Sequence, residues 1–357
     1  MSLANLASQI DTPMNSIDDT ANPTTVEPPN FSTEVVATVV AKTFNLNGEY
    51  SQLVSERDQN FRLRTSDGQG FVVKITGLSE DRTATEFQIA MLSHFEESNF
   101  NYAPRVFRTV SGEKRGTISS ESGQEYSLRV VTWLDGTLLN NIALTTHHVT
   151  RFGQRLAELD LSLENFQFDG DGQAGLWDMQ QALQLRSLLP HVNDEKVQSY
   201  TRSVLSRFDD TVLTALRALP RQAIHNDANP ENILIDADGD VSGFIDFGDA
   251  LKAPRIIEVA TAASYLRSGD ENPLKFIEAF VDGYHQRSAL SDAEFEILFD
   301  LIRTRLAMTL IILYWRLTAR DEDDPYRQKT IENESNAFEF LVYLSDLGRD
   351  AFNRCIK

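Results

Sequence analysis

Residues 225–249 read His-Asn-Asp-Ala-Asn-Pro-Glu-Asn-Ile-Leu-Ile-Asp-Ala-Asp-Gly-Asp-Val-Ser-Gly-Phe-Ile-Asp-Phe-Gly-Asp, and this stretch decides most of what the sequence predicts. Apolar residues on both sides of Asp238-Gly239-Asp240 predict a β-hairpin, because Asp-Gly between two apolar runs is a strong turn signal. One carboxylate, Asp227, precedes the first strand, and another, Asp246, follows the second. Both are therefore expected where strands end in loops, which is a common position for catalytic groups.

The polar residues of this stretch have the spacing of a phosphoryl-transfer centre. His225-x-Asp227 is followed by Asn232 and later by Asp246-Phe247-Gly248, the order of a kinase catalytic loop and its metal-binding triplet. Asp246 and the amide oxygen of Asn232 are ligands of the kind that Mg²⁺ prefers, and Asp227 is expected to accept the proton of an attacking hydroxyl. His225 is expected to brace the loop backbone. The alternative interpretation is a surface hairpin in which Asp and Asn only form turns.

A nucleotide-binding lobe is expected upstream, and a lysine on a strand is its first sign. Phe71-Val72-Val73-Lys74-Ile75 supplies that lysine, although a lone charge in such a run is also typical of a solvent-facing strand position. Glu86 follows in a segment with the amphipathic pattern of a helix. A strand lysine that reaches the α and β phosphates and pairs with a helix glutamate is the arrangement found in kinases.

The segments expected to surround the nucleotide are less distinctive. No glycine-rich loop lies between the first two strand-like runs, where residues 55–60 read Ser-Glu-Arg-Asp-Gln-Asn. The backbone amides of this hairpin and the Ser55 hydroxyl are candidates for phosphate contacts, and a plain polar hairpin tip is the alternative. Backbone groups from Thr132 to Leu134 are candidates for the purine edge, where a buried edge strand would give the same pattern.

These motifs together carry a family resemblance. The catalytic loop, the segment Ile245-Asp246-Phe247-Gly248-Asp249 and the hairpin at 55–60 resemble the aminoglycoside phosphotransferase and choline kinase superfamily, and within it the hydroxylysine kinase group and the kinase-like domains fused to class III aminotransferases. The resemblance implies a protein-kinase-like fold and transfer of the γ-phosphoryl of ATP or GTP to a hydroxyl of a small amine-bearing molecule.

The resemblance also implies roles for individual residues. By position, Asp227 would be the base, Asn232 and Asp246 the Mg²⁺ ligands, and Lys74 the phosphate contact with Glu86 as its partner. Glu258 stands where the family commonly has an aspartate that braces the catalytic loop.

The length and the pattern of the chain agree with a two-lobed α+β enzyme. At 357 residues the chain exceeds the size at which single hydrophobic cores stop growing. We expect a disordered leader at 1–30, a small N-terminal lobe with an antiparallel β-sheet at 31–134, and a larger, mainly helical C-terminal lobe at 135–357. Strands are expected at 50–56, 60–65 and 70–75, and helices at 33–44, 146–163, 178–189, 193–218, 256–267, 273–286, 292–318 and 330–352.

Composition limits the classes of partner. The chain has 33 basic and 53 acidic residues, so its net charge of −20 argues against nucleic acid or an anionic membrane as a partner and favours a cationic or zwitterionic substrate. Its single cysteine, Cys355, excludes an internal disulfide framework and fits a reducing cytoplasm. The longest apolar stretch, 306–315, is too short to span a bilayer and is typical of a core helix.

Candidates for holding a substrate ammonium group are Asp249, Asp178 beside Trp177, and the acidic run 321–324. A tryptophan face can stabilise a cation, whereas the acidic run is also typical of a solvated loop. The leading hypothesis is a Mg²⁺-dependent kinase for hydroxylysine-like, homoserine-like or choline-like compounds. An aminoglycoside-modifying phosphotransferase is a close variant. A nucleotide-binding pseudokinase scaffold is the alternative that the missing glycine-rich loop favours.

Overall fold

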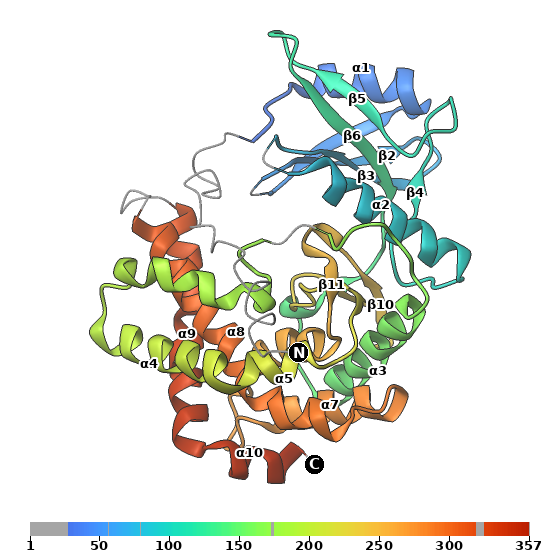
Figure 1. The fold of residues 1–357 in the computed structure, drawn as a ribbon. Helices are drawn as coiled ribbons and strands as arrows, with labels where there is room; N and C mark the ends of the chain where they lie inside the picture. Colours follow the sequence, from blue (N-terminus) through green and yellow to red (C-terminus); the bar gives the residue numbers. More distant parts are fainter. Residues whose placement is uncertain (1–27, 56, 79, 173–174, 319–324, 357) are drawn as a thin grey trace, which may run out of the picture.

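The computed structural model of the chain describes residues 28–356, apart from residues 56, 79, 173–174 and 319–324. The chain forms two lobes, a smaller one built on an antiparallel sheet and a larger one that is mainly helical (Figure 1). The expected α+β class and two-lobed architecture are therefore confirmed. Residues 1–27 of the predicted leader and the acidic run 321–324 lie outside the described residues.

The small lobe is organised around a sheet with the strand order β1-β2-β3-β6-β4, in which β5 also pairs with β6. All of these pairs are antiparallel. The strands are β1 (Gly48–Leu53), β2 (Gln59–Thr65), β3 (Gly70–Ile75), β4 (Val106–Phe107), β5 (Gly116–Ser119) and β6 (Glu125–Thr132). The three strands expected from the sequence are thus present, and their ends lie within three residues of the predicted ones.

The two faces of this sheet have different roles. Alternate residues of β2 and β3 are buried, because successive side chains of a strand point to opposite faces. The buried set packs under helix α1 (Thr33–Phe44) and includes Phe61, Leu63, Phe71, Val73 and Ile75. Lys74 lies between two of these positions, so it points to the opposite face, toward the large lobe.

Helix α2 (Arg82–Glu97) connects the two lobes. Its N-terminus is capped by Asp81, whose side chain accepts a hydrogen bond from the Thr83 amide at 3.0 Å. Its buried residues Phe87, Met91 and Phe95 belong to the hydrophobic core of the large lobe and not to the core beneath α1. The helix therefore fixes the small lobe against the metal-binding loop described below.

The large lobe packs its helices around one apolar core. The α-helices are α3 (Thr146–Leu163), α4 (Glu195–Arg207), α5 (Leu213–Arg217), α6 (Ile256–Ser264), α7 (Lys275–Arg287), α8 (Asp292–Thr318), α9 (Pro325–Leu347) and α10 (Arg349–Ile356). Tighter or wider turns complete the set: η2 (Leu139–Asn141), η3 (Met179–His191), η4 (Phe208–Val212) and η5 (Phe247–Asp249). Helix α8 is buried along most of its 27 residues, and none of the described helices is both long and apolar enough to cross a membrane.

Short strands hold the catalytic segment between the helices. Strand β9 (Ile233–Ile235) pairs with β10 (Val241–Phe244) and with β7 (Thr137–Leu138), and β8 (Gln222–Ile224) pairs with β11 (Leu251–Ala253). The β9–β10 turn contains Gly239 at φ 83°, a conformation that glycine adopts without steric cost. The predicted hairpin is therefore confirmed, with Asp227 in the loop before it and Asp246 after it.

Candidate active site

The catalytic loop runs from β8 to β9 and presents the carboxylate of Asp227. This carboxylate accepts hydrogen bonds from Asn229 Nδ2 at 3.0 Å and Asn232 Nδ2 at 2.7 Å, and Arg305 Nη2 lies 3.4 Å from Oδ1. Burial, followed by the negative charge of Asp249, raises the pKa of Asp227 to about 7. A carboxylate with a pKa near neutrality suits a group that must take a proton from a hydroxyl at physiological pH.

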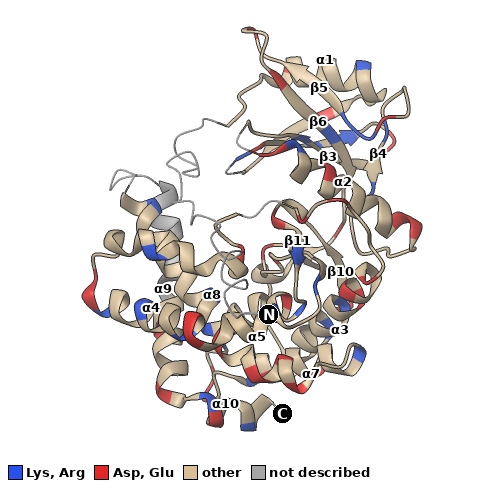
Figure 2. Ribbon diagram, in the orientation of Figure 1, with Lys and Arg blue, Asp and Glu red and all other residues tan. Residues whose placement is uncertain are grey.

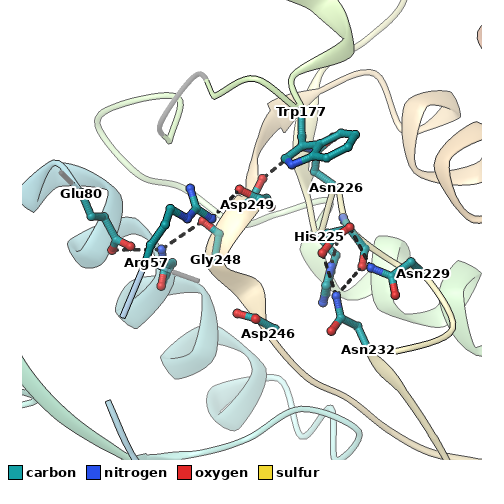
Figure 3. Close-up of polar contacts among 12 residues, drawn as sticks. Arg57, Glu80, Trp177, His225, Asn226, Asn229, Asn232, Asp246, Gly248 and Asp249 are labelled. Atoms are coloured by element: carbon teal, nitrogen blue, oxygen red, sulfur yellow. Dashed lines mark hydrogen bonds and ion pairs between the residues drawn. The ribbon is translucent and has the colours of Figure 1, made fainter. Parts of the chain in front are cut away.

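The amide of Asn232 has a fixed orientation. Its Nδ2 donates to the carbonyl oxygen of Asp227 at 2.9 Å and to the Asp227 carboxylate at 2.7 Å. The nitrogen is thus engaged by Asp227, and Figure 3 shows the amide oxygen on the side of Asp246. Because Nδ2 is held by these hydrogen bonds, Oδ1 is the amide atom that would coordinate a metal ion.

Asp246 follows β10 in a left-handed backbone conformation, with φ 58°. Lys74 Nζ lies 3.3 Å from its Oδ1, and the charge of Lys74 is the main cause that lowers the pKa of Asp246 to about 2. Asp246 is therefore ionised at pH values at which Asp227 is partly protonated. Two carboxylates with pKa values pushed apart can serve as metal ligand and base.

The donor set fits a magnesium ion that arrives with a nucleotide. Within the described part of the chain, no group of three or more His, Cys, Asp or Glu side chains is arranged to hold a metal ion. Mg²⁺ commonly takes only one or two protein carboxylates and completes its octahedron with phosphate oxygens and water. Asn232 and Asp246 would supply hard oxygen donors from the two ends of the β9–β10 hairpin (Figure 3).

Buried hydrogen bonds hold the catalytic loop against the rest of the site. The Asp227 amide donates to His225 Nδ1 at 3.2 Å, and His225 Nε2 lies 2.9 Å from the carbonyl oxygen of Ile245. The imidazole thus accepts on Nδ1 and donates from Nε2, which ties the catalytic loop to the strand that leads to Asp246. His225 braces the loop, as expected from the sequence.

Glu258 provides a second brace, from helix α6. Its side chain is fully buried, and Oε2 accepts a hydrogen bond from the Asn226 amide at 2.7 Å. Asn226 itself has φ 64° and donates from Nδ2 to the carbonyl oxygen of Asp249 at 3.1 Å. Glu258 therefore makes the bracing contact that the family resemblance assigns to an aspartate at this position.

The predicted ion pair between Lys74 and Glu86 is wrong. Lys74 contacts Asp246, whereas Glu86 Oε1 lies 2.9 Å from Arg82 Nε and 3.6 Å from Arg115 Nη2. Helix geometry explains the difference: residues two positions apart point in nearly opposite directions, and Gln88 is the residue that faces the site. Glu86 is left on the outer face of α2.

Gln88 is a residue that the sequence interpretation missed. It is 3% exposed, and its Nε2 lies 3.2 Å from the carbonyl oxygen of Gly248 and 3.3 Å from Glu80 Oε1. The bond to Gly248 connects α2 to the loop that carries Asp246. The sequence could have indicated that Gln88 is buried, because it lies one helical turn from Ala84 and from Met91, on the apolar face of the helix.

The structure restricts the predicted nucleotide contacts. The amide of Thr132 donates to Arg105 O, and the amide of Trp133 donates to Gly70 O, both at 2.9 Å, so neither N–H is free for a purine edge. Leu134 lies against β10, since a Cβ built on Gly243 would meet Leu134 Cδ1 at 2.6 Å. Ser55 is partly buried in the turn between β1 and β2.

The predicted substrate residues divide into two groups. Asp249 lies beside Trp177 at the opening, where Arg57 Nη2 contacts its Oδ1 at 3.1 Å (Figure 3). Asp178 is 4% exposed and caps η3, accepting from the Gln180 amide at 2.9 Å, which favours a structural role.

Arg305 on α8 was also missed. It is 1% exposed, its guanidinium lies 4.4 Å from the centre of the Trp177 ring, and its Nη2 lies 3.4 Å from Asp227 Oδ1. The sequence shows it only as a charged residue at the edge of a long apolar run, a position that more often indicates the end of a buried segment.

Comparison with known proteins finds similar proteins that cover most of the chain. A hydroxylysine kinase of Mus musculus is 25% identical over 348 residues, covering 90% of this chain and 92% of the relative. Among solved structures, an amicoumacin kinase in complex with AMP-PNP and Ca²⁺ superposes with a TM-score of 0.68 at 13% identity, covering 88% of this chain and 94% of that one. A microcompartment-associated aminopropanol kinase gives a TM-score of 0.62 at 15% identity, covering 88% and 98%.

The sequence model of one family, described as the phosphotransferase enzyme family, matches residues 49–295. This match spans both the strand that carries Lys74 and the loops that carry Asp227 and Asp246. It covers more than half of the 357 residues, and the chain therefore belongs to the phosphotransferase enzyme family.

Proposed function

We propose that this small-molecule kinase transfers the γ-phosphoryl group of ATP or GTP to the hydroxyl of a small amine-bearing substrate of the hydroxylysine type. The observation that carries the proposal is the placement of two carboxylates at the two ends of one hairpin, each with its own partners. Asp246 Oδ1 lies 3.3 Å from Lys74 Nζ, and the Asp227 carboxylate accepts hydrogen bonds from Asn229 Nδ2 and Asn232 Nδ2. The pKa of Asp246 is lowered and that of Asp227 is raised to about 7, which agrees with these two roles. A metal ligand and a base in one opening are the two protein groups that phosphoryl transfer to an alcohol requires.

In this site Asp227 would orient the acceptor hydroxyl and take its proton as the bond to phosphorus forms. Lys74 would contact the nucleotide phosphates, and Asn232 and Asp246 would hold the divalent ion, which supplies positive charge to the phosphate oxygens. Asn229 and Asn232 restrict rotation of the Asp227 side chain, which keeps its free lone pairs directed at the acceptor.

An amine-bearing acceptor is supported by the acidic side of the opening. Asp249 adds a carboxylate beside Asp227, and Trp177 adds an aromatic face. An ammonium group is attracted by both kinds of group. The relatives point the same way, since the names of the similar proteins include a hydroxylysine kinase and an aminopropanol kinase.

The test combines binding with turnover. Phosphate transfer is measured with ATP and with GTP, with Mg²⁺ present or chelated, over a panel of hydroxylysine, homoserine, choline, aminopropanol and an aminoglycoside. We expect turnover with at least one hydroxylated amine, and loss of turnover when the metal is removed. A protein that binds nucleotide but phosphorylates none of the panel would favour the pseudokinase alternative.

The Asp227→Ala variant separates the proposed base from nucleotide binding. We expect kcat to fall by about 10³-fold or more, because the proton acceptor and the orienting group are both lost. The thermal shift produced by the nucleotide should stay close to that of the wild type. Loss of nucleotide binding together with activity would contradict the assignment of Asp227 as the base.

A further inference from the structure

We propose that Arg57 binds the γ-phosphate of the nucleotide, and that Asp249 is its partner only while the nucleotide is absent. This inference rests on the proposed kinase function and extends it to a catalytic residue in the turn between β1 and β2. That turn lacks the glycines that would let several of its backbone amides approach the phosphates closely. A side-chain cation can supply the missing positive charge.

The position of Arg57 fits this role. Its guanidinium extends from the small lobe to the metal-binding loop, where Nη2 lies 3.1 Å from Asp249 Oδ1 (Figure 3). A Cβ built on Gly248 would lie 3.9 Å from Arg57 Nη2 and 3.2 Å from Asp246 Oδ1, so the guanidinium and the metal-ligating carboxylate flank the same point. A phosphate coordinated by a metal on Asp246 would lie within reach of Arg57.

The backbone next to Arg57 is fixed to the small lobe, while the Arg57 side chain extends to the large lobe. Asp58 Oδ1 accepts a hydrogen bond from the Gly77 amide at 3.1 Å, which ties the turn to the segment between β3 and α2. The approach is close enough that a Cβ on Gly77 would lie 2.3 Å from the Arg57 carbonyl oxygen. The guanidinium is therefore presented from a fixed base, as electrostatic stabilisation of a transition state requires.

The charges around Arg57 explain why it would exchange partners. Its side chain is 44% exposed, and its bond to Asp249 is a single contact, whereas a phosphate offers three oxygens to the planar guanidinium fork. Burial acts to lower the pKa of Arg57, but the charge and hydrogen bond of Asp249 raise it overall, so the guanidinium stays charged. Lys74 pairs with Asp246 and is the proposed contact of the inner phosphates, which leaves the outer phosphate to Arg57.

The exchange has a consequence for the order of binding. Once Arg57 turns to the nucleotide, Asp249 loses its ion pair with Arg57 and can receive the ammonium group of the acceptor beside Trp177. Nucleotide binding should therefore strengthen acceptor binding. The Asp249 carboxylate would thus pair with Arg57 before the nucleotide binds and with the ammonium group of the acceptor afterwards.

The test compares ATP with ADP, which differ in the group that Arg57 is proposed to bind. For Arg57→Ala we expect affinity for ATP to fall about tenfold or more while affinity for ADP changes less than about twofold, and kcat to fall by about 10²-fold to 10³-fold. Arg57→Lys, which keeps the charge without the fork, should recover part of both losses. Arg64→Ala is the matched control, because Arg64 is an exposed arginine of the same hairpin.

The Asp249→Asn variant gives a readout of opposite sign. Removal of the carboxylate should strengthen ATP binding by freeing Arg57, and should raise the KM for the amine acceptor at saturating nucleotide. An unchanged ratio of ATP to ADP affinity in Arg57→Ala, with wild-type protein active, would overturn the role of Arg57 alone. Wild-type protein that neither binds nucleotide nor phosphorylates the panel would overturn the proposed function as well.

Discussion

At the residue scale, the catalytic loop depends on one buried acceptor. Asn226 has a left-handed backbone, at φ 64°, and its amide points into the protein, where Glu258 Oε2 receives it at 2.7 Å. A buried amide without a partner costs free energy comparable to a lost hydrogen bond. Glu258 therefore helps to impose the unusual conformation of the residue next to Asp227.

Glu258→Ala and Glu258→Gln distinguish this brace from a general packing effect. The alanine variant leaves the Asn226 amide without its acceptor, and we expect the free energy of unfolding to fall by about 1–3 kcal/mol, with a lower kcat. The glutamine variant keeps an acceptor oxygen in nearly the same place, so it should retain most of the stability and most of the kcat. Denaturant unfolding and steady-state kinetics measure the two effects. Equal losses in both variants would argue against the hydrogen bond to Asn226 as the cause.

The residues of the site differ in how far sequence could predict them. Asp227, Asn232 and Asp246 are close in sequence, and a single hairpin brings them together, so their spacing was informative. The choice between Glu86 and Gln88 depended on the rotation of one helix, which the apolar pattern defines only approximately. Arg305 lies 78 residues beyond Asp227, and no local pattern records such a contact.

At the element scale, the crossing of α3 and α7 shows how glycine permits close packing. A Cβ on Gly153 would lie 2.1 Å from the Phe280 carbonyl oxygen, and one on Gly283 would lie 2.3 Å from the Thr150 carbonyl oxygen. Both contacts are with backbone, which cannot move aside without moving the helix. The helices that support the catalytic strands are thus held at a distance that only glycine allows at these two positions.

Gly283→Ala should therefore separate the two helices. We expect a loss of about 1–3 kcal/mol in the free energy of unfolding, because overpacking against backbone forces the helices to shift. Gly269→Ala is the control, since a Cβ there would meet no atom within 4 Å, and its effect should stay within about 0.5 kcal/mol. A comparison of thermal unfolding of the two variants checks the prediction, and equal stabilities would contradict it.

The elements themselves were largely predictable where the pattern was long. The expected helix at 146–163 matches α3, which many turns of apolar periodicity define. The expected helix at 292–318 matches α8, which is defined by a long apolar segment that is buried on most sides. The expected helix at 178–189 is a 3₁₀ segment, which contains Pro190 and so lacks one backbone donor. The short strands β4, β5 and β7 were missed because runs of two to four residues carry no measurable alternation. Strands β9 and β10 are as short, but the Asp-Gly turn between them marked both.

At the scale of the whole molecule, charged residues are distributed over both lobes, and a few of the acidic ones are buried. Figure 2 shows acidic and basic residues in both lobes. A few acidic groups lie inside the large lobe instead, where Asp160 is 1% exposed and Glu258 is fully buried. Asp160 Oδ2 accepts a hydrogen bond from the Tyr284 hydroxyl at 2.5 Å, which links α3 to α7 beneath the catalytic loop.

These buried carboxyls predict how stability depends on pH. Burial, and next the negative charge of Glu258, raises the pKa of Asp160 well above its ordinary value; burial also raises the pKa of Glu258. A carboxyl whose pKa is higher in the folded state stabilises the fold fully below its unfolded value, about 4, and this contribution is lost as the pH rises through the folded value. The contribution of these two carboxyls to the free energy of unfolding should therefore decrease as the pH rises above about 4.

Asp160→Asn isolates this contribution. The asparagine cannot ionise, and its amide oxygen can still accept from Tyr284, so the fold should persist with a shallower dependence on pH. One proton accounts for at most about 1.4 kcal/mol per pH unit, and the slope that remains would belong mainly to Glu258. Asp350→Asn, at an exposed position on α10, serves as the control and should follow the wild type. Denaturant unfolding across the pH range measures all three, and identical slopes in wild type and Asp160→Asn would show that Asp160 does not carry the effect.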